Sequence, residues 1–308
     1  MSIGMRIAKY RVAWLMYCAA ASVIDATGLR RSRATRRLVD RMSMIARRHV
    51  MRFLAPNVEE PVVVGGHWMI LTEEASASFS LRMLVGRYRV GPTRYLERRL
   101  RPGMSVIEAG AHHGYVTLAA ASLVGPRGRV FCFEPDPRNY VVLVKNIELN
   151  GYKNVRALDL AVGAGPGTAT LHRSNVYSGM SSVYRDMWAK GESLPVEMTS
   201  IDDFLEGAGW PTIDLVLMDV LGAESTAIAG MARLIERARS LELVVKLMPD
   251  KLELAGVRPE SLLDEMGRLG FAVYGILESG EVEAAKPAQL HALCSAGDPL
   301  NLCFRRET

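Results

Sequence analysis

The stretch SVIEAGAHHGY at residues 105–115, followed by RVFCFEP at residues 129–135, decides the fold of this chain. An apolar run ends in a glycine turn, a helix begins near residue 113, and a second apolar run ends in the carboxylate of Glu134. Gly110 and Gly114 leave space where the backbone turns and where a ligand approaches it closely. Glu134 is placed to accept hydrogen bonds from the two hydroxyls of a ribose. The stretch therefore predicts a nucleotide-cofactor site, although glycine turns of this kind also serve packing alone.

The glycine spacing indicates which cofactor suits this turn. The dinucleotide fingerprint G-x-G-x-x-G requires three glycines, but its positions are held here by Gly110, His112 and Tyr115. Glu108, two residues before Gly110, makes the turn acidic instead. An acidic turn suits a cofactor that has no phosphate and that ends in a cationic amino acid, and S-adenosylmethionine is such a cofactor. A nucleotide-dependent oxidoreductase is the alternative that this spacing disfavours.

Apolar segments alternate with helical segments outward from this stretch. We expect strands at residues 104–109, 129–134, 154–160, 214–220 and 242–247, and helices at residues 91–100, 113–123, 137–149 and 222–234. This alternation implies right-handed crossovers and a mostly parallel sheet covered on both faces. The late segments 271–274 and 300–305 have no good helix between them, which predicts an antiparallel edge hairpin. Residues 61–71 predict a short hairpin before the core.

Charge is distributed unevenly along the chain. Its 308 residues, 49% of them hydrophobic, suit one large α/β domain with an added segment. The first 52 residues hold 12 Lys or Arg against 2 Asp, a net charge of +10. The remaining residues hold 26 basic against 31 acidic side chains, a net charge of −5. The basic character therefore belongs to an N-terminal extension.

The N-terminal extension combines an apolar run with a basic helix. The run at residues 12–24 is shorter than the roughly 20 residues that span a bilayer, and no good cleavage site for a signal peptide follows it. Residues 31–54 predict a basic amphipathic helix, which suits an anionic membrane or an acidic partner. A helical lid or dimer arm with solvated arginines is the simpler interpretation. We divide the chain into a basic helical extension (1–55), short strands and a helix (56–100) and the cofactor-binding domain (101–308).

Cysteine spacing and composition indicate the compartment and the partners. Four cysteines, Cys18, Cys132, Cys294 and Cys303, support neither a disulfide framework nor a zinc site. We expect a cytoplasmic protein, in which residues 5–52 are the segment for peripheral contact with an anionic membrane at the inner membrane face. Aromatic residues are sparse among the arginines, so we expect no nucleic-acid partner. The oligomeric state is left open.

Several ordered motifs between about residue 86 and residue 304 resemble the FkbM-type S-adenosylmethionine-dependent methyltransferases. They are VIEAGA (106–111) with Gly114 and Tyr115, FEPDPRN (133–139), Asn146 with LNG (149–151), LAVG (160–163), TSIDDFL (199–205), and LMDV (217–220) with GAE (222–224). The resemblance implies a seven-stranded, Rossmann-like class I methyltransferase fold. It also implies methyl transfer to a hydroxyl of a small-molecule acceptor such as a sugar, a glycolipid or a natural product. The first sixty or so residues lie outside it.

The same resemblance implies roles for individual residues. Glu108, Gly110 and Gly114 would hold the methionine end of S-adenosylmethionine, Glu134 the ribose, and Asp159 to Ala161 the surroundings of the adenine. His112 is a further candidate for cofactor contact. Two positions depart from the family pattern, because the family usually has asparagine at position 112 and glutamate at position 221, where this chain has His112 and Leu221. These departures mark a different acceptor or a weakened enzyme. The alternative function is a catalytically idle cofactor-binding protein that the basic arm recruits to a membrane or partner.

Methyl transfer to a hydroxyl requires aligned reactants and removal of the hydroxyl proton. Asp219, at a strand end, is the first candidate for the catalytic base, with a helix cap as its structural alternative. Glu224 is a second base or a first-turn acid favoured by the helix dipole, and His112 is a third candidate. Lys246 contacts an anionic acceptor, neutralises Asp219 or extends to solvent. Asp219 and Glu224 alone do not make a site for a hard cation, so we expect no metal. The loop at residues 173–194 is expected to select the acceptor.

Overall fold

The computed structural model describes residues 60–72, 77–174, 178–185, 191–285 and 299–306. The chain divides into two compact units, with the boundary in the sequence between Tyr88 and Arg89. The first unit contains an antiparallel hairpin of β1 (Val62–Val64) and β2 (His67–Met69), and the helix α3 (Ala77–Leu84). The hairpin expected at residues 61–71 is therefore confirmed. The apolar run at residues 12–24 and the basic helix at residues 31–54 lie outside the described residues.

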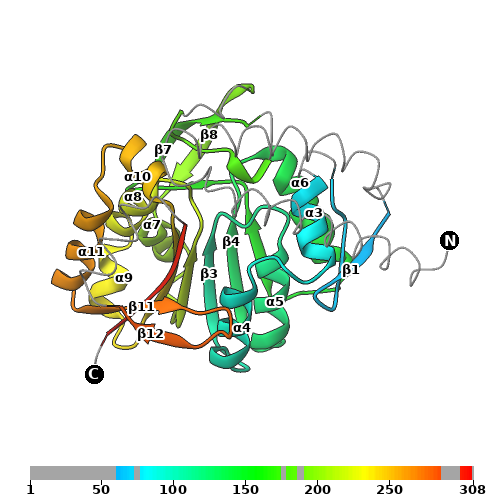
Figure 1. The fold of residues 1–308 in the computed structure, drawn as a ribbon, viewed down its shortest axis with the longest axis horizontal. Helices are drawn as coiled ribbons and strands as arrows, with labels where there is room; N and C mark the ends of the chain where they lie inside the picture. Colours follow the sequence, from blue (N-terminus) through cyan, green and yellow to red (C-terminus); the bar gives the residue numbers. More distant parts are fainter. Residues whose placement is uncertain (1–59, 73–76, 175–177, 186–190, 286–298, 307–308) are drawn as a thin grey trace, which may run out of the picture. The chain divides into compact units, whose positions relative to one another are not determined.

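The second unit is built on a mixed sheet (Figure 1), whose strands run in the order β12-β11-β13-β10-β9-β3-β4-β5. Their bounds are β3 (Ser105–Ala109), β4 (Arg129–Phe133), β5 (Val155–Leu158), β9 (Leu215–Met218), β10 (Glu242–Leu247), β11 (Phe271–Ile276), β12 (Val282–Ala284) and β13 (Leu300–Arg306). Strands β5, β4, β3, β9 and β10 pair in parallel. The expected α/β class is confirmed, and the described residues contribute eight strands to the sheet where seven were expected.

The antiparallel pairing expected between residues 271–274 and 300–305 is confirmed in β11 and β13, but β13 does not lie at the edge of the sheet. It lies between β10 and β11 and pairs antiparallel with both. Its residues Leu302, Cys303 and Phe304 are buried, as a strand inside a sheet requires. Among the described strands, β12 forms the edge instead and pairs with β11 alone. Within this part of the chain, β11 therefore connects to β10 through β13.

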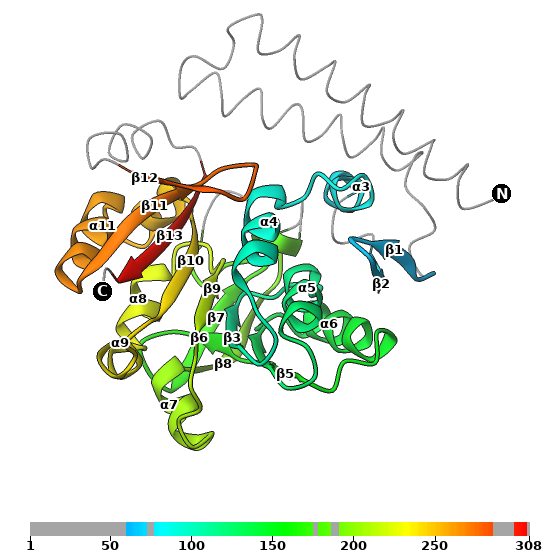
Figure 2. The ribbon, with the colours of Figure 1, turned by 90° about the horizontal axis from the view of Figure 1, so that it is seen from below.

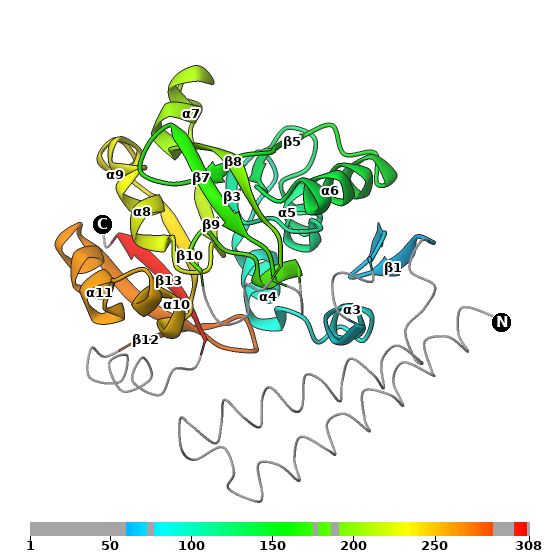
Figure 3. The same cartoon turned by 90° about the horizontal axis from the view of Figure 1, so that it is seen from above.

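Helices cover both faces of this sheet, as Figures 2 and 3 show. They are α4 (Val90–Arg99), α5 (Tyr115–Val124), α6 (Pro137–Leu149), α7 (Ile201–Gly207), α8 (Glu224–Ala229), α9 (Ala232–Arg237), α10 (Pro249–Leu254) and α11 (Pro259–Arg268). Val106, Leu217 and Val244 face α4 and α5. Their neighbours Ile107 and Val245 face α7, α9 and α11. This alternation buries each central strand on both sides. No helix among the described residues is both long and apolar enough to cross a bilayer.

The chain between β5 and β9 forms a second, three-stranded sheet that the sequence did not predict. Its strands β6 (Ala161–Val162), β7 (Gly167–His172) and β8 (Ser193–Thr199) lie in the order β6-β8-β7. A short 3-10 helix, η2 (Ser178–Met180), lies in the connection from β7 to β8. The loop expected at residues 173–194 therefore ends inside β8.

The single helix expected at residues 222–234 is wrong, because two helices, α8 and α9, occupy this region. The break falls near Gly230, where the backbone comes close to the small sheet. A Cβ at Gly230 would lie 2.0 Å from the carbonyl oxygen of Gly163, the residue that follows β6. The carbonyl of Gly230 also accepts a hydrogen bond from the N–H of Asp202 (2.9 Å). Contact with the small sheet thus explains a break that local helix propensity does not indicate.

Candidate active site

The candidate residues gather where four neighbouring parallel strands end at one edge of the sheet. Glu108 lies near the end of β3, Glu134 follows β4, Asp219 follows β9, and Lys246 lies near the end of β10. Electrostatic interactions join Glu108 to Asp219 and Glu134, and join Lys246 to His112 and Glu224. The fold thus brings together the three residues expected to be catalytic and two of the three acids expected to bind the cofactor, Glu108 and Glu134.

Contacts within the protein hold the glycine turn in place. Gly110 and Gly114 have φ angles of 87° and 88°, which favour glycine. A Cβ at Gly110 would lie 2.2 Å from the backbone oxygen of Asp219, and a Cβ at Gly114 would lie 2.7 Å from a methyl carbon of Leu143. Packing against protein atoms alone therefore accounts for both glycines.

The backbone donors of this turn are also used within the protein. The N–H groups of Gly110 and Ala111 both donate to the carbonyl of Phe133 (2.9 and 3.0 Å), and the N–H of Gly114 donates to the carbonyl of Ala111 (2.9 Å). A pyrophosphate would have to displace these acceptors, because dinucleotide sites bind phosphate through such N–H groups. The hydrogen bonds of the turn disfavour a dinucleotide cofactor.

Glu134 is buried and accepts three hydrogen bonds. Its Oε2 accepts from the backbone N–H of His112 (2.7 Å), and its Oε1 accepts from the N–H of Asp136 (3.1 Å) and from Nδ2 of Asn139 (3.2 Å). Burial raises the pKa of Glu134 to about 7, against the opposing effect of these donors. A carboxylate offers about four lone pairs, so Oε2 retains capacity for a further donor such as a ribose hydroxyl. Asn139 belongs to the FEPDPRN motif, which could have identified it.

Glu108 is buried in β3 and accepts a hydrogen bond from Oγ1 of Thr117 (2.5 Å), on α5. Burial is the largest cause that raises the pKa of Glu108, to about 8, and the Thr117 hydrogen bond opposes it. The group is therefore mostly protonated at neutral pH. A cation that entered the turn would favour its ionised form.

Asp219 binds two cations through one oxygen. Its Oδ2 accepts from Nη1 of Arg89 (2.7 Å) and from Nζ of Lys246 (3.2 Å). Its Oδ1 is buried and has no hydrogen-bond partner within the described part of the chain. Asp219 does not cap α8, whose N-cap residue is Ala223, and Lys246 neutralises Asp219. A buried carboxylate oxygen without a donor costs about 1–3 kcal/mol or more, so this atom is suited to receive a donor.

Arg89 is a site residue that sequence reasoning missed. It precedes α4 with a left-handed backbone (φ 46°) and pairs with a carboxylate 130 residues away. His112 (φ 52°) and Leu221 (φ 49°), at the same edge of the sheet, also adopt this conformation. A left-handed non-glycine residue costs about 1–2 kcal/mol, and such strain tends to collect at functional sites. No local pattern marks Arg89, because its partner is distant in sequence.

His112 and His113 lie side by side between the glycine turn and α5. Their rings stack with centroids 3.9 Å apart, and Nε2 of His112 lies 2.7 Å from Oγ of Ser178. Burial lowers the pKa of His113 to about 4 and the pKa of His112 well below its ordinary value. Both rings are therefore neutral at physiological pH. The carbonyl of His113 accepts from Nδ2 of Asn146 (2.8 Å), so the FkbM-type motif residue Asn146 supports the turn.

The remaining predicted residues occupy different surroundings. Glu224, fully buried, is the first residue of α8, and its carboxylate accepts from the N–H of Gly222 (2.9 Å). Burial raises the pKa of Glu224 to about 7. Asp159 is exposed directly after β5. Ala161 is buried with Leu171 and Val196 in the small sheet. Among the described residues, no group of three or more His, Cys, Asp or Glu is arranged to hold a metal ion.

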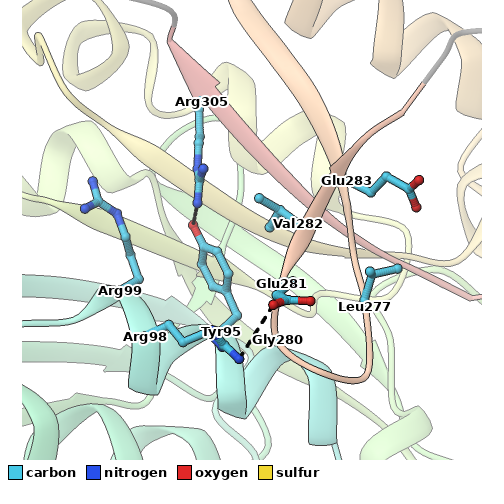
Figure 4. A pocket seen from close by; sticks show the side chains of 9 residues that line it. All are labelled: Tyr95, Arg98, Arg99, Leu277, Gly280, Glu281, Val282, Glu283 and Arg305. Atoms are coloured by element: carbon cyan, nitrogen blue, oxygen red, sulfur yellow. Dashed lines mark hydrogen bonds and ion pairs between the residues drawn. The ribbon is translucent and has the colours of Figure 1, made fainter.

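A separate pocket of about 560 Å³ lies between α4, the turn before β12, and β13 (Figure 4). Nη2 of Arg305 donates to the hydroxyl of Tyr95 (3.0 Å), as Figure 4 shows. Arg99 and Arg305 both pair with Glu242 (2.7 and 3.2 Å). The candidate residues described above do not line this pocket. The ion pairs of Arg99 and Arg305 with Glu242 hold α4 against the sheet, outside the candidate site.

Comparisons with known proteins show which family this chain resembles. The family model described as "Methyltransferase FkbM domain" matches residues 108–271. The 2-O-methyltransferase NoeI of Sinorhizobium fredii is 27% identical over 153 residues, which cover 45% of this chain and 62% of NoeI. Methyltransferase sdnD of Sordaria araneosa is 26% identical over 193 residues, which cover 53% of this chain and 72% of sdnD. A crystal structure of a SAM-dependent methyltransferase from Aquifex aeolicus covers 70% of this chain and 88% of its own, at 14% identity and a TM-score of 0.39.

Proposed function

Because this chain belongs to the FkbM methyltransferase family, whose cofactor is S-adenosylmethionine, we propose that it transfers a methyl group to a hydroxyl oxygen. The acceptor class is a sugar, a glycolipid or a natural product, as the ordered motifs imply. The name of NoeI, a 2-O-methyltransferase, supports oxygen as the acceptor atom. The match covers 62% of NoeI, so the activity of the whole protein belongs to this proposal.

The charges at the sheet edge fit this cofactor. Glu134 would accept hydrogen bonds from the ribose hydroxyls, since its Oε2 retains a lone pair beside the His112 bond. Glu108 would hold the cationic methionine end, because burial raises its pKa to about 8 and a nearby cation would favour its ionised form. Asp159 is exposed beyond β5, where it can contact the adenine. When bound, the cofactor supplies an electrophilic methyl group on a sulfonium. The thioether that leaves needs no protonation, so the site needs no general acid.

The observation that carries the proposed reaction is the buried Oδ1 of Asp219, to which no described residue donates a hydrogen bond. The acceptor hydroxyl would donate to this atom and pass its proton to Asp219 as its oxygen bonds to the methyl carbon. The bond between that carbon and the sulfonium sulfur would break, which would leave S-adenosylhomocysteine as a neutral thioether. Arg89 and Lys246 hold Oδ2 and thereby fix the direction of Oδ1. Glu224 is too deeply buried to touch an acceptor and orients the Gly222 turn instead.

Calorimetric titration tests the cofactor part of this proposal. Wild-type protein is titrated with S-adenosylhomocysteine and, separately, with NADH. We expect micromolar binding of S-adenosylhomocysteine alone, and at least a tenfold weaker affinity in Glu134→Ala. Glu148→Ala, which removes an exposed carboxylate from α6, is the matched control and should change the affinity less than twofold. Binding of NADH, or unchanged affinity in Glu134→Ala, would contradict the proposal.

Methyl transfer from labelled S-adenosylmethionine to a panel of sugar and glycolipid hydroxyls tests the reaction. Asp219→Asn keeps the shape of the side chain and removes its basicity. We expect it to lower kcat about 100-fold or more, while its affinity for S-adenosylhomocysteine stays within threefold of wild type. Cofactor binding without turnover of any acceptor in the panel would favour the catalytically idle alternative.

A further inference from the structure

Residues 178–184, in the connection from β7 to β8, contact both positions at which this chain departs from its family. Oγ of Ser178 lies 2.7 Å from Nε2 of His112. Oγ of Ser182 donates to the carbonyl of Leu221 (2.8 Å). His112 and Leu221 also share a left-handed backbone. Two departures far apart in sequence are thus joined by one short segment.

This segment has a defined position in the fold. The backbone of Ser182 exchanges two hydrogen bonds with His172, at the end of β7 (2.8 and 3.1 Å). Tyr184 lies against Gly222, where a Cβ would be 3.4 Å from the Tyr184 ring. Leu221 and Gly222 lie close in sequence to the candidate base Asp219, separated from it by Val220. The segment therefore borders the side of the site that an acceptor must approach.

The base of the same connection is tied to the ribose side of the site. Arg173, the residue after β7, binds both carboxylate oxygens of Asp136 (2.7 and 2.9 Å). Asp136 caps α6, and its backbone N–H donates to Oε1 of Glu134 (3.1 Å). A bidentate pair of this kind fixes both distance and orientation.

His112 links these two sides through separate groups. Its backbone N–H donates to Oε2 of Glu134, while its imidazole meets Ser178. Any change in how Glu134 is hydrogen-bonded therefore acts on the residue that holds Ser178. The Nε2 atom is already occupied by this contact, which suits a positioning role better than the removal of an acceptor proton.

We propose that residues 178–184 form the acceptor-side wall of the site and that His112 is a positioning residue that couples this wall to the bound cofactor. The inference rests on the proposed function, since the cofactor must bind at Glu134. Ribose hydroxyls on Glu134 fix the backbone of His112, His112 then holds Ser178, and the wall is completed before the acceptor enters. Coupling between two sites is reciprocal, so an intact wall also strengthens cofactor binding.

Hydrogen–deuterium exchange of the full-length protein, with and without saturating S-adenosylhomocysteine, tests this coupling. In wild type we expect S-adenosylhomocysteine to slow exchange in peptides that cover residues 178–185 by about threefold or more. In Ser178→Ala, which loses the imidazole contact, we expect this slowing to disappear and the affinity for S-adenosylhomocysteine to fall by about three- to tenfold. Ser178→Thr keeps a hydroxyl and should restore both effects.

The connection supplies its own matched control. Oγ of Ser193 lies 2.8 Å from Nδ1 of His172, a second serine–histidine pair that is exposed at the start of β8. Ser193→Ala should leave both the exchange of residues 178–185 and the affinity for S-adenosylhomocysteine at wild-type values. If S-adenosylhomocysteine slowed the exchange of residues 178–185 equally in wild type and Ser178→Ala, the inference would be overturned. It would also be overturned if S-adenosylhomocysteine bound to wild type without slowing this exchange. In both cases the proposed function would stand. Failure of wild type to bind S-adenosylhomocysteine would overturn the proposed function and this inference together.

Discussion

Asp219 holds two cations on one carboxylate oxygen, and these cations differ in their surroundings. The side chain of Arg89 is 14% exposed and lies 2.7 Å from Oδ2, whereas the side chain of Lys246 is 26% exposed and lies 3.2 Å away. We expect Arg89→Ala to lower the free energy of unfolding by about 1–3 kcal/mol, and Lys246→Met to lower it by less. Urea denaturation of both variants checks the order. Equal losses, or a larger loss in Lys246→Met, would show that the shorter pair is not the stronger one.

Glu108 gives the fold a definite dependence on pH. Because burial raises its pKa to about 8 in the folded state, against an ordinary value near 4.5, the folded protein binds more protons between these values. The contribution of Glu108 to stability is complete below about pH 4.5 and is lost as the pH rises through about 8. The loss is at most about 1.4 kcal/mol per pH unit.

Glu108→Gln tests this dependence, because glutamine imitates the protonated acid and can still accept from Thr117. Between pH 5 and pH 8, we expect the free energy of unfolding to fall less steeply in Glu108→Gln than in wild type. Denaturation at several pH values measures both slopes. Parallel slopes would mean that Glu108 is ionised in the folded protein and that its surroundings are more polar than its burial indicates.

At the scale of elements, the end of β9 lies against the turn that follows β3. Gly110 and Gly151 both have positive φ angles (87° and 67°), but a Cβ at Gly110 meets the backbone of Asp219, while a Cβ at Gly151 meets nothing within 4 Å. Gly151→Ala should therefore cost only the left-handed backbone, about 1–2 kcal/mol. Gly110→Ala should cost several kcal/mol more or prevent folding, as thermal denaturation would show. Similar losses would mean that the junction between β3 and β9 can open.

Elements with a continuous apolar or amphipathic pattern were predictable from the sequence. The helix α6 and the strand β10 have the predicted bounds, and β3, β4 and β11 differ from them by two residues or fewer. The small sheet escaped prediction because β6, although buried, has only two residues, and because Leu171 is the one buried residue of β7, so neither strand shows a long apolar run. The place of β13 inside the sheet was also missed, since pairing order depends on contacts between distant strands.

At the scale of the whole molecule, the candidate site was predictable wherever a strand end or a motif marked it. Glu108, Glu134 and Asp219 end neighbouring strands, and such ends meet at one edge of a parallel sheet. Arg89, Ser178 and Thr117 carry no such mark. Their partners lie 130, 66 and 9 residues away, and the side chains meet only after the sheet and its helices have assembled.

The proposed cofactor contacts all lie in the second unit, which begins at Arg89. We therefore expect removal of residues 1–55 to leave the affinity for S-adenosylhomocysteine within about twofold of the full-length value, as calorimetry can measure. This outcome agrees with an N-terminal arm that acts as a tether. A loss of more than tenfold would mean that the extension takes part in the cofactor site.

The position of β13 has a consequence for the order of events during synthesis. The strands that carry the candidate site, β3, β4, β9 and β10, leave the ribosome before β11, and β11 leaves it before the strand that joins it to β10. Residues 271–276 must therefore wait for residues 300–306, and the edge of β10 stays open in the meantime. We expect the nascent chain to acquire its cofactor-binding edge first, and a chaperone that covers open strand edges to act on the late, incomplete side of the sheet.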